Sequence, residues 1–481
     1  MSDQSARASH DSGVPENLLR FMTSGWALPP ATAATPIEGS AAFAARRAAL
    51  SRAFPGEALI VPTGHEKTRA NDTVYRFRPG TAFYYLTGNV EPDNVLVLMP
   101  KAGGHDAVLY CEPNPGKTDA TFFTDRAKGE LWVGPRLGLE QTAQRYGMKT
   151  TSLAAFPDDL KEIARGPHRA LRGVDPQLDV ALAADAERDA AFATALSEMR
   201  LIKDEHEVNE LRGAIAATHR GFDDVVRALP GAATERVIEG VFNLRARVDG
   251  NDVGYNTIAA SGPNACTLHW TRNDRTIGEN ELVLIDAGVE AQSLYTADVT
   301  RTLPVSGTFT ADQRTIYELV LAAQDAAFAK CAPGNDFLAP NAAAMEVLAR
   351  GLERLGVIPS AAEALEDQNQ FYKRYSLHNV SHMLGLDVHD CAQARAETYR
   401  FGALAPGMVL TVEPGLYFQP DDLTVPARYR GIGIRIEDDV LITPTGVDIL
   451  SAAIPRTVDD VEAWVQSGLK ALRPGLRAPH A

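Results

Sequence analysis

An internal repeat in the C-terminal half of the chain constrains its fold more than any other feature. The segment ELVLIDAG ends at Gly288 and resembles MVLTVEPG, which ends at Gly415; each is an apolar run with one acid just before a turn. A second β-like segment follows each run, and these segments carry Asp298 and Glu437. Two such halves facing each other would gather four carboxylates at one point, which is costly unless cations neutralise them.

The first half contains an acid pair, Asp286 and Asp298, placed symmetrically about Gln292 in a strand–turn–strand pattern. A hairpin would put the two carboxylates opposite each other, where like charges repel. The apolar approach over 282–285 predicts that Asp286 ends a buried strand. Taken alone, the pair fits a turn acid and a solvated strand acid about as well as it fits a site.

The second half also pairs acids with strands. In the predicted strand over 431–436, the two-residue period places Arg435 and Glu437 on the same face, and in 408–413 it does the same for Thr411 and Glu413. Taken alone, a neighbouring Arg and Glu more often form an ion pair than a site. Glu413 also fits a simple turn acid, because Pro and Gly follow it.

Histidines make the chemistry more specific. Three of the 11 histidines in the chain, His378, His382 and His389, fall within the short window HNVSHMLGLDVHD. A neutral imidazole beside oxygen ligands suits a borderline divalent metal such as manganese, cobalt or zinc, whereas an all-oxygen magnesium or calcium site does not need it. Any one of these histidines alone would more often be structural than catalytic.

A family resemblance rests on five of these residues taken in order. The chain resembles the proline-specific metallopeptidases with the pita-bread fold at Asp286 in LIDAG, Asp298 in ADVTRT, His382 in SHMLGLDVHD, Glu413 in TVEPG and Glu437 in RIEDD. Nearer the N-terminus, TAFYYLTGNVEPDNVLVL and LWVGPRLG resemble the creatinase-like domain that precedes catalysis in this family. The resemblance implies an α/β N-terminal creatinase-like domain followed by an α+β pita-bread catalytic domain.

The resemblance also implies a dinuclear metal centre. Two divalent ions, expected to be manganese with cobalt or zinc as alternatives, would be held by Asp286, Asp298, His382, Glu413 and Glu437. Four carboxylates balance the charge of two such ions, so a hydroxide that bridges them is the expected nucleophile. Glu413 matches the general base of the family.

Further catalytic residues are implied by the same resemblance. His269 in CTLHW and His389 in DVHD match substrate-orienting histidines, and His378 matches a histidine that lines the proline site or relays protons. Arg435 and Tyr417 match a pair close to the metals. For these two, a packed aromatic ring and a structural ion pair are as plausible as a catalytic role.

Two positions depart from the family pattern. Asn379 stands where the family usually has glycine, and Asn accepts a positive φ better than most residues. The spacing from Asp286 to Asp298 is one residue longer than expected, and we place the extra residue in the hairpin tip near Ser293.

The expected activity is the release of the N-terminal residue from peptides with proline in the second position. Ser381, before the ligand histidine, favours aminopeptidase P over prolidase, which cleaves only Xaa-Pro dipeptides. A methionine aminopeptidase would normally lack the N-terminal domain. A non-catalytic pita-bread binding module is the alternative of another class, and the five intact ligand positions disfavour it.

Composition limits the partners. With 47 Lys and Arg against 62 Asp and Glu, the net charge of -15 disfavours binding to nucleic acid or to an anionic membrane. Four scattered cysteines, the lack of a secretory-type apolar segment and the lack of an apolar run of about 20 residues predict a cytoplasmic protein. Kinship implies a homo-oligomer, a dimer or a tetramer, that acts on proline-containing peptides.

The expected domain plan has four parts. A flexible arm over 1–37 precedes the creatinase-like domain over 38–199, which alternates a helix over 41–54 with apolar runs over 58–61 and 94–99. The catalytic domain covers 200–469, and a tail covers 470–481. Helices are expected in the catalytic domain near 208–229, 235–249, 312–330 and 342–355.

Overall fold

The computed structural model describes residues 13–27 and 33–471, and the chain divides into two compact units, Met1–Leu196 (unit 1) and Ser197–Ala481 (unit 2). The predicted arm over 1–37 lies partly outside the described residues, and its described part contains helix α1 (Glu16–Met22). The predicted tail over 470–481 lies almost entirely outside them. Within 13–27 and 33–471, no helix has both the length and the apolar character that a membrane crossing needs.

Unit 1 is built on a mixed five-stranded sheet in the order β6-β5-β4-β1-β7. Strand β1 pairs antiparallel with β4 and parallel with β7, and β5 pairs antiparallel with β4 and parallel with β6. The strands are β1 (Ala58–Pro62), β4 (Val95–Lys101), β5 (Gly104–Cys111), β6 (Lys149–Ser152) and β7 (His168–Ala170). A separate short hairpin is formed by β2 (Thr68–Ala70) and β3 (Thr73–Val74).

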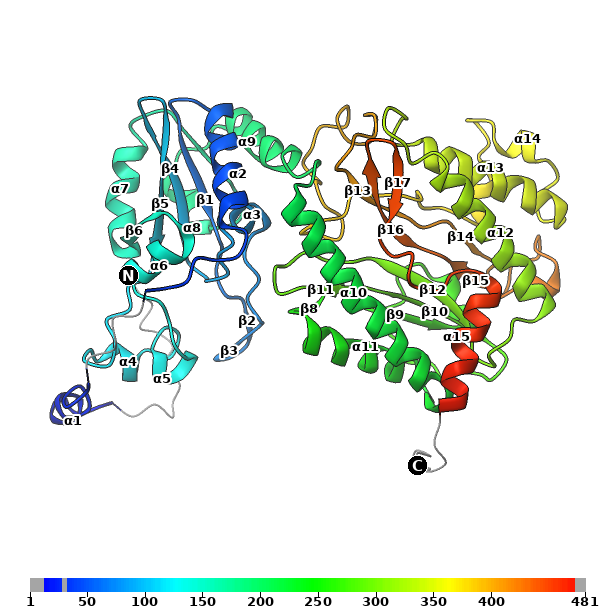
Figure 1. Cartoon of the computed structure of the whole chain (residues 1–481), viewed down its shortest axis with the longest axis horizontal. Coiled ribbons are helices and arrows are strands. Elements are labelled where there is room, and N and C mark those ends of the chain that lie inside the picture. The colour runs from blue at the N-terminus through cyan, green and yellow to red at the C-terminus, as the bar shows by residue number, and fades with distance from the viewer. Residues whose placement is uncertain (1–12, 28–32, 472–481) are drawn as a thin grey trace. The chain divides into compact units, whose positions relative to one another are not determined.

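Helices flank this sheet, as Figure 1 shows. They are α2 (Ser40–Ala53), α3 (Thr81–Thr87), α6 (Leu139–Tyr146), α7 (Phe156–Ile163), α8 (Pro176–Ala181) and α9 (Ala186–Glu198), with two short helices, α4 (Thr121–Thr124) and α5 (Glu130–Val133). The core between α7 and the sheet buries Ile60, Val97 and Phe156. Alternating helices and apolar strands therefore form an α/β layer structure, as the sequence pattern predicts.

Unit 2 contains two antiparallel three-stranded sheets that correspond to the two halves of the sequence repeat. The first has the order β12-β10-β9 and the second has the order β13-β16-β17. Their strands are β9 (Ile258–Ser261), β10 (Leu282–Ala287), β12 (Val299–Pro304), β13 (Val409–Val412), β16 (Asp438–Thr443) and β17 (Gly446–Ile449). Two-stranded pairs join β14 (Gly415–Tyr417) to β15 (Gly433–Arg435) and β8 (Asp252–Val253) to β11 (Val289–Glu290).

Helices pack against these sheets, with α11 on β9 and α12 on β13, β14 and β15 (Figure 1). They are α10 (Glu205–Ala228), α11 (Glu235–Asp249), α12 (Ala311–Phe328), α13 (Ala339–Arg354), α14 (Ala361–Ala364) and α15 (Val458–Ala471). Helix α10 begins with a capping box formed by Asp204 and Glu207. Helix α12 begins with one formed by Thr310 and Gln313. Because such caps satisfy the free amide groups of the first turn, they fix where each helix starts.

A buried arginine joins the two halves of unit 2. Arg301 on β12 is fully buried, and its guanidinium donates to the carboxylate of Asp438 at 2.7 Å and to the carbonyl of Glu437 at 2.6 Å. The backbone amide of Glu437 donates in turn to the carbonyl of Thr300 at 3.1 Å. These bonds hold the second acidic segment against the first, which the repeat in the sequence predicts.

Candidate metal centre

The hairpin of β10 and β12 carries the first two acids. Asp286 is the penultimate residue of β10, and Asp298 directly precedes β12. The prediction that the two carboxylates lie opposite each other is wrong, because Asp286 pairs with Thr300 and Asp298 lies two residues before Thr300. Side chains two residues apart on a strand share a face, so both carboxylates still reach the same side of the sheet.

The shift in register arises at the hairpin tip. The Ala291 amide donates to the Tyr295 carbonyl at 2.9 Å, and Leu294 has a positive φ of 63°. This closed turn contains Ser293, at the position where the extra residue is expected. A left-handed residue is costly for a leucine, and here the surrounding turn imposes it.

The second half brings Glu413 and Glu437 into the same place. Glu413 follows β13 and Glu437 lies between β15 and β16, so the strand predicted over 431–436 is shorter than expected and ends at Arg435. The chain leaves the ladder there because Glu437 turns inward, where it accepts a 2.6 Å hydrogen bond from the Thr300 hydroxyl. Glu437 is 1% exposed, so its carboxylate depends on these contacts.

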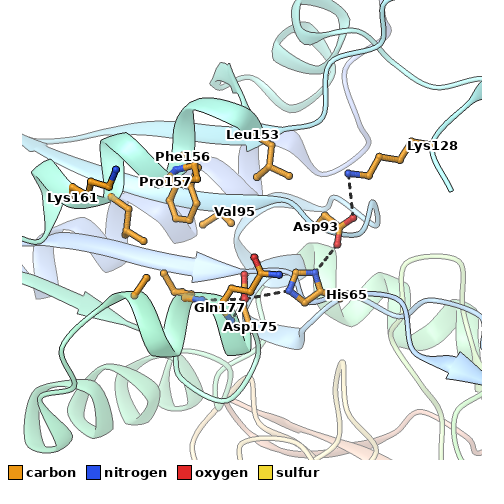
Figure 2. Close-up of a pocket in the computed structure, with 13 residues that line it drawn as sticks. His65, Asp93, Val95, Lys128, Leu153, Phe156, Pro157, Lys161, Asp175 and Gln177 are labelled. Atoms are coloured by element: carbon orange, nitrogen blue, oxygen red, sulfur yellow. Dashed lines mark hydrogen bonds and ion pairs between the residues drawn. The ribbon is translucent and has the colours of Figure 1, made fainter. Parts of the chain in front are cut away.

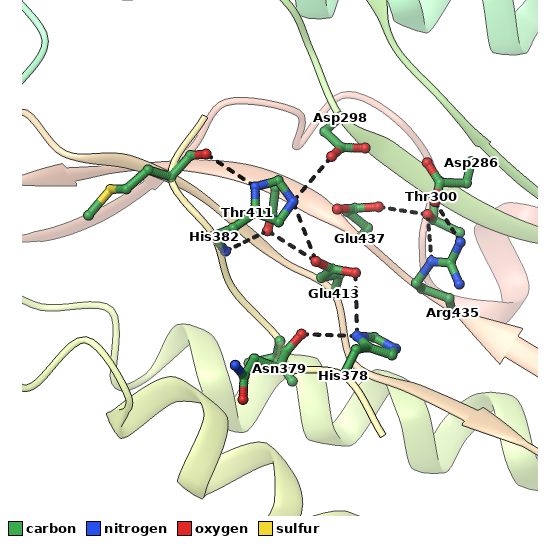
Figure 3. Close-up of polar contacts among 12 residues, drawn as sticks. Asp286, Asp298, Thr300, His378, Asn379, His382, Thr411, Glu413, Arg435 and Glu437 are labelled. Atoms are coloured by element: carbon green, nitrogen blue, oxygen red, sulfur yellow. Dashed lines mark hydrogen bonds and ion pairs between the residues drawn. The ribbon is translucent and has the colours of Figure 1, made fainter. Parts of the chain in front are cut away.

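The Nε2 side of the His382 ring faces Asp298 and Glu413, as Figure 3 shows. Its Nδ1 lies 3.1 Å from the carbonyl oxygen of Met383, which can only accept, so Nδ1 carries the hydrogen. The Nε2 atom, on the opposite side of the ring, lies 3.3 Å from Asp298 and 3.5 Å from Glu413. A backbone carbonyl that fixes the tautomer in this way is the usual outer partner of a metal-binding histidine.

One cavity of about 650 Å³ is lined by every residue predicted as a ligand or catalytic group except Tyr417. One possible ligand atom from each of Asp298, His382 and Glu437 lies within 4.8 Å of the others. The residues that line the cavity include Asp286, Asp298, His382, Glu413, Glu437, His269, His378, His389 and Arg435.

The electrostatics of this cavity favour a bound cation. Burial, reinforced by the neighbouring carboxylates, raises the pKa of Glu437 well above its ordinary value and raises the pKa of Glu413 to about 7. Burial also raises the pKa of Asp298. Burial alone would lower the pKa of His382, but the hydrogen bond with Asp298 and the charge of Glu413 raise it to about 9. Without a metal the centre therefore retains protons in place of divalent charge.

The donor set fits divalent metal ions. Carboxylate oxygens supply the charge and one imidazole nitrogen supplies a softer ligand, which together suit a borderline metal such as manganese, cobalt or zinc. Three of these donors are oriented by residues that are not ligands themselves. Met383 contacts His382, and Thr300 contacts Glu437. Arg435 contacts Asp286. Such outer contacts are what a preorganised metal site requires.

Comparisons with known proteins agree with this geometry. Residues 209–444 match the model of metallopeptidase family M24, and residues 43–171 match that of the aminopeptidase P N-terminal domain. "Xaa-Pro aminopeptidase 1" of Streptomyces coelicolor is 50% identical over 457 residues, which cover 94% of this chain and 92% of that protein. Escherichia coli Xaa-Pro aminopeptidase is 33% identical over 444 residues, which cover 88% of this chain and 97% of that protein.

The chain belongs to metallopeptidase family M24.

Solved aminopeptidase structures have the same fold as this chain. Aminopeptidase P from Escherichia coli with the inhibitor Pro-Leu superposes with a TM-score of 0.81 at 32% identity, covering 91% of this chain and all of that one. Aminopeptidase PepP of Pseudomonas aeruginosa gives a TM-score of 0.80 at 32% identity, covering 90% of this chain and 99% of that one. The predicted family, the predicted fold and the assignment to a metal-dependent aminopeptidase are confirmed.

In this M24 chain a second group of residues connects the predicted catalytic side chains. Arg435 donates to Asp286 at 2.5 Å and to the Tyr417 hydroxyl at 2.9 Å. That hydroxyl is also 2.8 Å from Nε2 of His378. Nδ1 of His378 lies 3.5 Å from Glu413, as Figure 3 shows. Burial lowers the pKa of His378 to about 4, so this imidazole is neutral near pH 7.

The two exposed histidines lie at the open side of the cavity. His389 has its ring centroid 4.4 Å from that of His382, and burial followed by the charge of His382 lowers the pKa of His389. His269 lines the same cavity. Asn379 does not adopt the left-handed conformation suggested for it; its carbonyl instead accepts from Nδ1 of His378 at 2.9 Å, which any residue at this position can do.

Sequence reasoning missed Tyr255. Its hydroxyl lies 2.6 Å from Asp286 and also contacts Asp298, so it lies between the first two acids. A phenol has one hydrogen and can donate to only one carboxylate at a time, which leaves the other in need of a proton or a cation. Tyr255 is 31 residues from Asp286 along the chain, and no local pattern marks it.

Two further acids were also missed. Asp438 and Asp439 are fully buried, and Asp439 accepts from the Asp298 amide at 3.1 Å while Asp438 binds Arg301. The run of three acids in RIEDD was the available signal. It indicates a buried polar network as much as a ligand, because only Glu437 faces the cavity.

Proposed function

We propose that this enzyme releases the N-terminal residue from peptides that carry proline in the second position. The observation that carries the proposal is the convergence of the nine predicted ligand and catalytic side chains, from both halves of unit 2, on one cavity. The names of the relatives support the same specificity, since both the Streptomyces and the Escherichia coli proteins are Xaa-Pro aminopeptidases.

The proposed metal ligands are Asp286, Asp298, His382, Glu413 and Glu437, which would hold two divalent ions. Manganese is the proposed native metal, with cobalt and zinc as alternatives, because the set mixes one imidazole with hard carboxylates. Ions in such a set supply Lewis acidity toward the attacking water and the peptide carbonyl.

Proton transfer falls to Glu413 in this proposal. Burial raises its pKa to about 7 in the absence of metal, and it lies between His378 and His382 at 3.5 Å from each. Its carboxylate would take a proton from the attacking water and return it to the proline nitrogen as the peptide bond breaks. Without this proton the proline nitrogen would have to leave as an anion, which is a poor leaving group.

The histidines and Arg435 would position the substrate and the ligands. His269 and His389 lie at the exposed side of the cavity, where a ring N–H can donate to the carbonyl of the bound peptide. His378 and Tyr417 form a hydrogen-bonded pair beside Glu413 and keep its carboxylate in place. Arg435 fixes Asp286 through its 2.5 Å contact.

A peptide panel tests the proposed specificity. The protein is loaded with manganese and given three substrates that share a first residue: Xaa-Pro-Yaa, Xaa-Ala-Yaa and the dipeptide Xaa-Pro. The proposal predicts rapid cleavage of the first and little of the second. Cleavage of the dipeptide alone would make the enzyme a prolidase, and equal cleavage of the first two would remove the proline specificity.

We further propose that the enzyme is a homo-oligomer, a dimer or a tetramer, assembled through unit 1. Unit 1 exposes several large apolar side chains, three of them consecutive on α5, and exposed apolar surface is a mark of interaction sites. They include Phe21 (77% exposed), Leu131 (57%), Trp132 (50%) and Val133 (50%). Sedimentation of the wild type and of Leu131→Lys decides the matter: an assembly weakened by the charge supports the proposal, and a monomeric wild type refutes it.

The proposed compartment is the cytoplasm. All four cysteines, Cys111, Cys266, Cys331 and Cys391, are buried and unpaired by disulfides, which suits a reducing environment. Localisation of a tagged chain in cell fractions tests this, and recovery from an oxidising compartment would contradict it.

A further inference from the structure

Unit 1 contains a second cavity, which is lined by none of the residues of the metal centre. Its volume is about 670 Å³, within the range of roughly 300–1,000 Å³ that small-molecule sites occupy. Figure 2 shows its lining, with Lys161 at one end, His65 at the other and Phe156, Leu153 and Val95 between them. The cavity therefore has an apolar middle and a polar end.

The polar end is a histidine held between two carboxylates. Nδ1 of His65 is 2.6 Å from Asp93, and Nε2 is 3.2 Å from Asp175. Asp175 also caps α8, because its carboxylate accepts from the amides of Gln177 and Leu178 at 2.8 and 3.2 Å. Helix capping explains the presence of Asp175, whereas it leaves Asp93 unexplained.

Asp93 is held in an unusual backbone conformation. The φ angle of Asp93 is 63°, and its amide donates to the carbonyl of Gly64 at 2.9 Å. Gly64 itself has a φ of 93°. A non-glycine residue pays for a left-handed conformation, and such residues concentrate at binding sites. Here the conformation directs the Asp93 carboxylate at His65 and at the cavity.

The charge balance leaves this end negative. Lys128 is 3.9 Å from Asp93 but 3.0 Å from Glu112, and Lys161 is 2.6 Å from Asp158, so each lysine has a nearer carboxylate outside the cavity lining. Burial alone would lower the pKa of His65, but the hydrogen bond to Asp93 and the nearby carboxylate of Asp175 raise it. The two carboxylates outweigh the single imidazole in either of its protonation states, so this end of the cavity carries net negative charge.

The walls supply apolar contact. Val95, Phe156, Leu160 and Leu178 are buried and line the cavity together with the half-buried Leu153. A ligand body of aliphatic or aromatic character would remove this surface and its own from water, which stabilises the complex.

We propose that the cavity of unit 1 binds an organic amine, with the ammonium group at Asp93 and the aliphatic or aromatic body against the wall formed by Val95 and Phe156. The site is separate from peptide hydrolysis, and its ligand is recognised by one positive charge next to an apolar group. A neutral molecule of the same shape would leave the negative end unpaired, and an anion would be repelled.

Calorimetric titration with a matched pair of probes tests the proposal. The probes are 2-phenylethylamine and 2-phenylethanol, which share a body and differ in charge. The full-length, metal-loaded protein is expected to bind the amine saturably and at least tenfold more tightly than the alcohol. Equal affinity for the two probes, or no saturable binding of the amine at millimolar concentration, would overturn the proposal.

Single-residue variants test where on the protein the amine binds. Asp93→Asn keeps the size of the side chain and tolerates a positive φ, so it is expected to fold, to hydrolyse peptides normally and to lose amine affinity at least tenfold. Asp72→Asn, at an exposed position in the turn between β2 and β3, is the matched control and should bind as the wild type does. His382→Ala should also retain the amine. Retained binding in Asp93→Asn, or lost binding in His382→Ala, would refute a site in unit 1.

Discussion

At the scale of single residues, Tyr255 has the clearest untested role. Its hydroxyl contacts both Asp286 and Asp298, so it sets the distance between two proposed ligands. We expect Tyr255→Phe to weaken metal binding by about 10- to 100-fold, as removal of an outer contact usually does. Calorimetric titration of the metal-free protein with manganese measures this directly, independently of turnover.

Tyr417→Phe is the matched control for this prediction. It removes a hydroxyl that contacts His378 and Arg435 and touches no proposed ligand. We therefore expect Tyr417→Phe to lower kcat more than it lowers metal affinity. If both variants bound manganese as the wild type does, Tyr255 would have no part in holding the ligands.

The sequence was sufficient to find the proposed ligands and insufficient to find their supports. Asp286, His382 and Glu413 stand in short motifs whose order is specific, so they can be identified one by one. Tyr255 and Thr300 act through tertiary contacts across 31 and 137 residues, respectively. A contact of this kind depends on strand register and packing, which no local pattern encodes.

At the scale of elements, Gly288 permits the close approach of the hairpin strands that carry the first two acids. A Cβ at this position would lie 1.6 Å from the backbone oxygen of Ala297, a residue whose amide donates to the Val289 carbonyl across the hairpin at 3.2 Å. We expect Gly288→Ala to destabilise unit 2 by about 3 kcal/mol or more, since such overpacking usually costs about 1–3 kcal/mol even where side chains can yield. Denaturant unfolding of the metal-free protein gives the value.

Gly213→Ala on α10 is the control, because a Cβ there meets nothing within 4 Å. In a helix that change should stabilise by about 0.5–1 kcal/mol. Similar stabilities for Gly288→Ala and the wild type would show that the hairpin does not need the close approach.

The loop that carries His389 is anchored by a buried charge cluster. Asp390 accepts from Arg200 at 2.9 Å and lies 3.5 Å from Nζ of Lys203, and all three side chains are at most 5% exposed. Asp390→Asn removes the carboxylate that neutralises two buried cations, so we expect a loss of about 3–5 kcal/mol at pH 7. Denaturant unfolding of both proteins without metal measures the difference.

The same cluster predicts a pH dependence. Burial opposes ionisation, but Lys203 and Arg200 hold the pKa of Asp390 below its ordinary value. A depressed carboxyl pKa stabilises the fold above the unfolded pKa of about 3.9 and loses that contribution as the pH falls through the folded pKa. The stability gap between wild type and Asp390→Asn should therefore be constant from pH 5 to 7 and shrink below about pH 4. A gap that grew in acid would contradict this assignment.

The bounds of the helices were easier to predict from the sequence than the pairing of the strands. The helix predicted over 235–249 has those bounds in α11, and the one over 208–229 is α10 with its start moved to Glu205, because the capping box at Asp204 sets the first turn. The register of β10 with β12 was not predictable, since one residue in the tip shifts every pair. Likewise, the inward turn at Glu437 follows from Thr300 on another strand.

At the scale of the whole molecule, the metal centre belongs to unit 2 alone, while unit 1 has its own sheet and core. A ligand stabilises only the unit that it binds, by about 2.7 kcal/mol at a free concentration of 100 times Kd. We expect manganese to raise the unfolding temperature of one calorimetric transition and to leave a second unchanged. A single transition that moves as a whole would show that the units unfold together.

Residues of unit 2 would hold two divalent ions, and cleavage of Xaa-Pro bonds is expected to require both, which a stoichiometric titration measures. Metal-free protein is titrated with manganese while bound metal and the initial rate of Xaa-Pro-Yaa cleavage are followed together. We expect no activity without metal, activity that saturates at two ions per chain, and complete loss on chelation. Full activity in the metal-free protein, or two bound ions per chain with no cleavage of any Xaa-Pro peptide, would contradict this expectation.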